Sequence, residues 1–124
     1  MHTTMNLTNL DYLKLMADGD RDMEQTMLEM LLVELPEEFD KMKTLFAASA
    51  WLPLSKVSHK MKSTLPFIGN DELTSANLRI EQLTKQEDHP PLKDEIIIIE
   101  NSIQQFGNLL PGVIEELNKI LNTY

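Results

Sequence analysis

The chain has no cysteine, no long apolar run and a deficit of basic residues. Without cysteine there is neither a disulfide framework nor thiolate chemistry, which suits a reducing cytoplasm. The longest purely apolar run, residues 96–99, is far too short to cross a bilayer. The net charge of -9 disfavours nucleic acid and anionic membranes as partners. We therefore expect a cytoplasmic protein that binds neither nucleic acid nor membrane.

Motifs for nucleotide and zinc sites are also absent. There is no G-x-x-x-x-G-K-[ST], no G-x-G-x-x-G and no H-E-x-x-H. The three histidines, at positions 2, 59 and 89, are too scattered to predict a metal cluster. His89 precedes Pro90 in a polar loop, so we interpret it as a loop residue. We expect no cofactor or metal of the chain's own, and one domain over residues 1–124.

Apolar residues recur at steps of three and four through almost the whole chain, which predicts helices. The expected helices are a short one at 7–17 and four longer ones at 20–48, 51–69, 71–87 and 92–122. The predicted inward stripe of the second helix consists of Leu28, Leu32, Leu35, Phe39, Met42 and Phe46. The sequence therefore indicates an all-α protein.

Capping residues and prolines refine these helices. Thr8 or Asn6 is the expected N-cap of the first helix, and Asp20 that of the second. Asn70 or Asp71 is the expected N-cap of the fourth helix. In the last helix we expect Pro111 to cause a kink and not a stop.

One outward-facing histidine stands out in the third helix. His59 lies roughly 150° around the helix from the centre of its apolar stripe, and Lys62 lies one turn later on the same side. An imidazole with an ordinary pKa of about 6.5 is largely neutral at pH 7, so a ring nitrogen can act as a nucleophile. A phosphoryl group bound there would bring negative charge, which a nearby lysine offsets. The plainer alternative is an exposed histidine on a polar helix face.

Residues 59–69 read H-K-M-K-S-T-L-P-F-I-G and are followed by Leu73, Asn77, Ile80 and Glu81. This segment resembles the signature of the histidine-containing phosphotransfer (HPt) domain of multistep phosphorelays. That signature is H-x-[hydrophobic]-K-[G/S]-x-x-x-x-x-G, followed by a helix of the form L-x-x-x-small-x-x-L-[E/Q]. Ser63 stands where many members have glycine, and Pro66 within the helix is uncommon.

The resemblance implies an antiparallel up-down four-helix bundle with an additional short N-terminal helix across one end. It implies that His59 accepts a phosphoryl group on Nε2 from a receiver-domain aspartyl phosphate and passes it to a response regulator. Lys62 would stabilise the phosphoryl charge, and Glu81 would orient the ring by bonding its other nitrogen. Such a protein is a phosphocarrier without kinase activity of its own.

The implied partners are a hybrid sensor histidine kinase and response-regulator receiver domains, with Mg²⁺ bound in the receiver. The bundle would be complete as a monomer. The residues expected to dock the partner are Lys60, Ser63, Leu15, Met16, Met23 and Met27. The methionines also have a structural interpretation, in which Met23, Met27 and Met30 hold the short first helix.

Two other functions fit the same helices. One is a helical protein-interaction module whose histidine is idle. The other is a degenerate dimerisation domain of a histidine kinase, which would associate through its helices. There is no room in the chain for an ATP-binding domain, so an autophosphorylating kinase is not expected.

Overall fold

The structure is a computed structural model that describes residues 6–124, and His2 of the sequence lies outside the described residues. These residues form five α-helices and one short 3₁₀ helix, with no strand among them. The elements in chain order are α1 (Asp11–Ala17), α2 (Arg21–Ala47), α3 (Trp51–Thr64), η1 (Leu65–Phe67), α4 (Asp71–Thr84) and α5 (Lys93–Leu121). The prediction of an all-α protein is confirmed.

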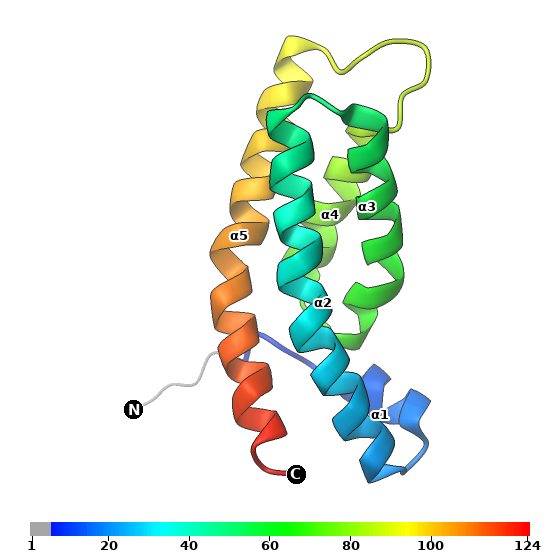
Figure 1. The fold of residues 1–124 in the computed structure, drawn as a ribbon, viewed down its shortest axis with the longest axis vertical. Coiled ribbons are helices and arrows are strands. Elements are labelled where there is room, and N and C mark those ends of the chain that lie inside the picture. The colour runs from blue at the N-terminus through cyan, green and yellow to red at the C-terminus, as the bar shows by residue number, and fades with distance from the viewer. Residues whose placement is uncertain (1–5) are drawn as a thin grey trace.

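Four long helices lie side by side, and α1 lies at one end of them (Figure 1). Helix α2 packs against α3 and α5, and α4 packs against the same two helices. Helix α1 contacts α2 and η1. Apolar side chains from all five helices meet in the larger of two core clusters, which includes Leu13, Leu28, Met61, Leu73 and Phe106. Burial of these apolar side chains holds the helices together.

Two predicted N-caps are confirmed. The Asp20 carboxylate accepts a hydrogen bond from the Met23 amide at 3.0 Å, and the Asn70 side chain accepts one from the Leu73 amide at 2.9 Å. Each bond satisfies a backbone donor that the first turn of a helix leaves free. Helix α5 continues past Pro111, so that proline does not stop it.

The prediction for the first helix is wrong at its start, because α1 begins at Asp11 and not at residue 7. The expected caps are wrong too. Thr8 Oγ1 donates to Glu116 on α5 at 2.6 Å, and the Leu7 amide donates to the same carboxylate at 2.8 Å. Glu116 therefore holds the chain before α1 in a non-helical course across the end of α5.

The inward face of α2 differs from the predicted stripe. Leu28, Leu35 and Met42 are fully buried as predicted, whereas Leu32, Phe39 and Phe46 are only partly buried. Leu31 and Glu38 are buried as well. Because α2 packs against α1, α3 and α5, its covered face is wider than a single stripe.

The third helix is shorter than predicted. It ends at Thr64 and continues as the 3₁₀ turn η1, which contains Pro66. Proline has no amide hydrogen to donate to an α-helical bond, so a tighter turn follows naturally. Gly69 then turns the chain with a φ of 70°. Helix α4 also ends early, at Thr84 and not at residue 87.

The hydropathy of the helices was compared with what a membrane-spanning helix requires. Between residues 6 and 124, no helix combines the length and the apolar character that a membrane span requires.

Candidate functional site

Helix α3 presents His59 to solvent and keeps its apolar stripe in the core. Ser58 and Met61 are buried, while the His59 side chain is 71% exposed. This rotation of the helix follows from its inward residues, which recur at steps of three and four. The sequence-based prediction of an outward histidine is confirmed.

Glu81 on α4 brings the three predicted site residues together. Its Oε2 lies 2.6 Å from His59 Nδ1, and its Oε1 lies 3.0 Å from Lys62 Nζ. A carboxylate only accepts hydrogen bonds, so in the neutral ring the proton resides on Nδ1. The exposed Nε2 then keeps its lone pair, which is the form that a nucleophile needs.

The Glu81 side chain is only 5% exposed, yet it is charged. Burial by itself raises the pKa of a carboxyl group, but hydrogen bonds from Lys62 and His59 outweigh burial and hold the Glu81 pKa below its ordinary value. Glu81 therefore stays an acceptor at neutral pH. The buried carboxylate fixes the orientation of a ring that solvent otherwise surrounds.

A second buried carboxylate lies on the other side of α3, and the sequence analysis missed it. Glu38 of α2 is 3% exposed, and its Oε1 lies 2.7 Å from Lys60 Nζ. Lys41 lies 3.6 Å from the same oxygen. The hydrogen bond to Glu38 raises the pKa of Lys60. The sequence does indicate the burial of Glu38, because it lies three residues after Leu35 and four before Met42 on the inward face of the helix.

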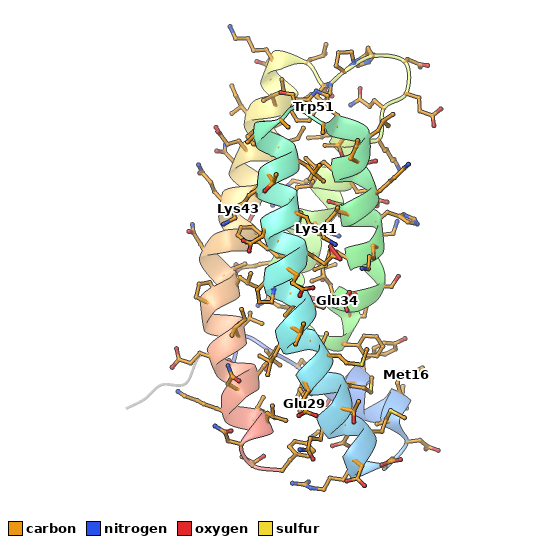
Figure 2. The ribbon with its side chains drawn as sticks, in the orientation of Figure 1. Met16, Glu29, Glu34, Lys41, Lys43 and Trp51 are labelled. Carbon is orange, nitrogen blue, oxygen red and sulfur yellow. The ribbon has the colours of Figure 1, made fainter. Side chains whose placement is uncertain are left out.

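The predicted docking residues are distributed over three helices. Lys60 and Ser63 of α3 are exposed, as are Leu15, Met16 and Met23 at the end of the bundle that carries α1. Figure 2 shows Met16 on α1 and Glu29 and Glu34 on the neighbouring face of α2. Met27 is partly buried and packs against the core cluster that includes Leu13 of α1, whereas Met30 is exposed like Met23.

A groove between α2 and η1 combines Met27, an expected docking residue, with residues that the sequence did not indicate for docking. Its volume is about 230 Å³, and it is lined by Met27, Met30, Leu31, Glu34, Thr64 and Phe67. The Phe67 ring also packs against Tyr12 of α1, with ring centroids 5.1 Å apart. An apolar surface therefore extends from α2 over η1 to α1.

Two other polar residues lie apart from this site. Arg79 of α4 bonds Ser102 and Gln105 of α5 and so faces away from α3. His89 is exposed in the loop between α4 and α5, where its Nδ1 lies 2.7 Å from the Pro90 carbonyl. Within residues 6–124, no three acidic or histidine side chains are grouped so as to hold a metal ion.

Comparison with known families agrees with the geometry of the site. The family model of the Hpt domain matches residues 26–119, which include α3, α4 and most of α2 and α5. No significant match to a curated protein or to a solved structure was found. Hpt domains are phosphocarriers of phosphorelays rather than kinases, and their partners are response regulators and histidine kinases. The chain belongs to the Hpt domain family.

Proposed function

We propose that His59 receives a phosphoryl group from the aspartyl phosphate of one receiver domain and passes it to an aspartate of another. Nε2 attacks the phosphorus, the P–N bond forms, and the aspartyl oxygen leaves as carboxylate. The reverse sequence on a second receiver regenerates the free ring. The observation that carries the proposal is an exposed imidazole whose Nδ1 lies 2.6 Å from a buried carboxylate.

Glu81 supports both directions of this transfer. While it accepts the Nδ1 proton, the lone pair is on Nε2 and can attack. After transfer, the same bond keeps Nδ1 protonated on the phosphorylated ring, so the ring departs as neutral imidazole, a good leaving group for the next receiver. The buried position of Glu81 keeps water from competing for Nδ1.

Lys62 is the cation that we assign to the phosphoryl group. Its side chain is half exposed, so the ammonium can reach solvent on the His59 side of α3. A phosphoryl group on Nε2 carries more negative charge on its oxygens than one oxygen of Glu81 does. The Lys62 ammonium can stabilise that negative charge. Lys60 is held by Glu38 and is placed at the rim of the partner's contact surface.

The docking surface that we propose begins at His59 and continues toward α1. His59, Ser63 and Phe67 follow one another at intervals of four residues. Next to them lies the groove that Met27 and Met30 line, and η1 contacts α1, which carries the exposed Leu15. Apolar side chains beside a reactive group provide the contact area that a transient partner needs.

The fold that we propose for this function is the antiparallel up-down bundle expected from the sequence. Support comes from short connections between helices that pack on each other, as between α2 and α3 or α3 and α4. The chain then acts as a monomer with its reactive face free. We assign Mg²⁺ to the receiver, whose acidic pocket supplies most of the catalysis.

The test is phosphotransfer from a phosphorylated receiver domain in the presence of Mg²⁺. We expect an acid-labile, base-stable phosphate on His59, with no label on the folded His59→Gln variant. Circular dichroism checks the fold of the variant, and His89→Gln is the matched control, which keeps full labelling. A chain that takes no phosphate from a panel of receivers would favour the interaction module over the phosphocarrier. Light scattering after size exclusion tests the monomer against a dimerisation domain.

A further inference from the structure

Beneath the reactive histidine lies a polar contact between α4 and α3 that the proposed transfer does not use. Asn77 of α4 is 1% exposed, and its Nδ2 donates to the backbone carbonyl of Ser58 at 2.9 Å. Ser58 is fully buried and directly precedes His59. This amide therefore holds the backbone of α3 at the residue next to the phosphoacceptor.

The contact belongs to the same face of α4 as the His59 partner. Asn77 and Glu81 are four residues apart, so they lie one turn apart on one side of the helix. Asn77 binds the α3 backbone, and Glu81 binds the His59 ring. Two side chains of α4 thus fix two parts of α3: Asn77 fixes the backbone at Ser58, and Glu81 fixes the His59 ring.

Stability alone does not account for an asparagine at this position. Its Oδ1 and the Ser58 Oγ are buried without a hydrogen-bond partner in the part of the chain that the structure describes. Unsatisfied buried polar atoms destabilise a fold, and asparagine is a poor helix former. The HPt pattern has a small residue here. A polar group kept at such a cost is expected where it serves function.

We propose that Asn77 is a positioning residue for His59, an inference that rests on the proposed function. The ring is mostly exposed, so only its own backbone and Glu81 hold it in place. A bond of 2.6 Å between Nδ1 and Oε2 requires the backbone of α3 to stay at a fixed distance from α4. If the backbone of α3 relaxes, the bond between His59 and Glu81 lengthens. The Nδ1–H tautomer is then less favoured, and a smaller fraction of the molecules presents a free Nε2.

The variant Asn77→Leu tests this directly, because leucine has the same branched arrangement of side-chain heavy atoms and makes no hydrogen bond. Unfolding in urea should show unchanged or higher stability, since an unsatisfied atom is removed. Nitrogen-15 spectra of the imidazole should show a smaller fraction of the Nδ1–H tautomer. The rate of phosphate acceptance should fall on the order of tenfold, as expected for a slightly misplaced nucleophile.

Two further variants make the test specific. Asn77→Ala should show the same loss of tautomer preference and rate, which guards against a leucine that fits badly. Ser102→Ala is the matched control, because it removes a buried polar contact between Arg79 of α4 and α5. The control should leave the tautomer fraction and the rate unchanged.

The outcomes separate this inference from the proposed function. If wild-type protein is phosphorylated and both Asn77 variants keep its tautomer fraction and rate, the positioning role is wrong and the transfer function stands. If wild-type protein accepts no phosphate, the tautomer spectra still test whether Asn77 positions His59. A shifted tautomer in the folded variants supports positioning, and an unshifted one overturns it.

Discussion

Lys62 Nζ lies 3.0 Å from Glu81 Oε1, so Lys62 and His59 share one buried carboxylate. The two oxygens of Glu81 are thereby divided between a cation and the reactive ring. Phosphorylation of His59 would offer Lys62 a stronger anion nearby while Glu81 keeps its bond to Nδ1. The site can thus change the partner of its lysine without losing the orientation of its ring.

The first prediction concerns the pH dependence that Glu81 gives to folding. Its pKa is lowered in the folded protein from an ordinary value of 4.5. A lowered carboxyl pKa contributes stability above pH 4.5, and that contribution is lost as the pH falls through the folded-state pKa. At pH 7 we expect Glu81→Gln to lower the free energy of unfolding by about 1–2 kcal/mol.

Urea unfolding of wild type and Glu81→Gln from pH 7 down to pH 3 checks this prediction. The gap in free energy should narrow below pH 4.5. The control is Glu100→Gln on an exposed part of α5, for which we expect no more than a few tenths of a kcal/mol. A gap that widens as the pH falls below 4.5 would contradict the direction of the Glu81 shift.

The second prediction separates the position of Lys62 from its charge. Lys62→Met should slow phosphate acceptance by His59 roughly tenfold, because one positioned cation near the phosphoryl group is lost. Lys56→Met removes the same charge from an exposed site one turn before His59 on the same helix. We expect the Lys56 variant to transfer within about twofold of wild type. Equal losses in both variants, measured by single-turnover transfer, would assign the effect to net charge alone.

Much of the fold was predictable because the apolar residues of a packed helix recur with the helical period. Leu28, Leu35 and Met42 are buried as predicted, and Asp20 and Asn70 cap helices as predicted. These features depend on residues close together in sequence. The start of α1 was not predictable in this way, because Glu116 competes for the backbone donors of residues 7 and 8.

The candidate site was predictable in part. The resemblance to the HPt signature indicated Glu81 as the partner of His59, and the structure does bring the two within hydrogen-bond distance. Periodicity did not indicate which polar residues would be buried beside them. Glu38 and Asn77 have apolar neighbours at helical spacing, and only the packing of α2, α3 and α4 reveals their partners Lys60 and Ser58.

The third prediction concerns the turn between η1 and α4. A Cβ at Gly69 would overlap the carbonyl oxygen of Asn9, and the φ of 70° also disfavours a side chain. Gly19 has a similar φ of 80° but open space around it. Gly19→Ala should cost about 1 kcal/mol for the backbone alone, and Gly69→Ala about 2–4 kcal/mol.

Urea unfolding of the two glycine variants measures the difference. The excess cost at Gly69 reports the contact with the segment before α1, whose Asn9 amide donates to the Ile68 carbonyl at 2.8 Å. Amide exchange should therefore rise in α1 of Gly69→Ala more than in α1 of Gly19→Ala. Equal costs and equal exchange would show that this segment yields easily to a methyl group.

The last prediction concerns the docking surface. Leu15 is 71% exposed on α1, and Leu52 is 50% exposed at the opposite end of α3. Because both side chains are already in water, Leu15→Ser and Leu52→Ser should change the free energy of unfolding little. If the receiver covers the surface toward α1, the Leu15 variant alone should bind it less tightly. We expect its Kd for a receiver to rise roughly fivefold, equivalent to about 1 kcal/mol.

Transfer kinetics at varied receiver concentration distinguish docking from chemistry for these variants. Leu15→Ser should raise the concentration for half-maximal rate and keep the maximal rate, because His59 and Glu81 are untouched. A fall in the maximal rate would mean that α1 affects the reactive ring itself. If Leu52→Ser weakens binding and Leu15→Ser does not, the receiver docks on the other half of α3, and the groove of Met27, Met30 and Phe67 is left uncovered.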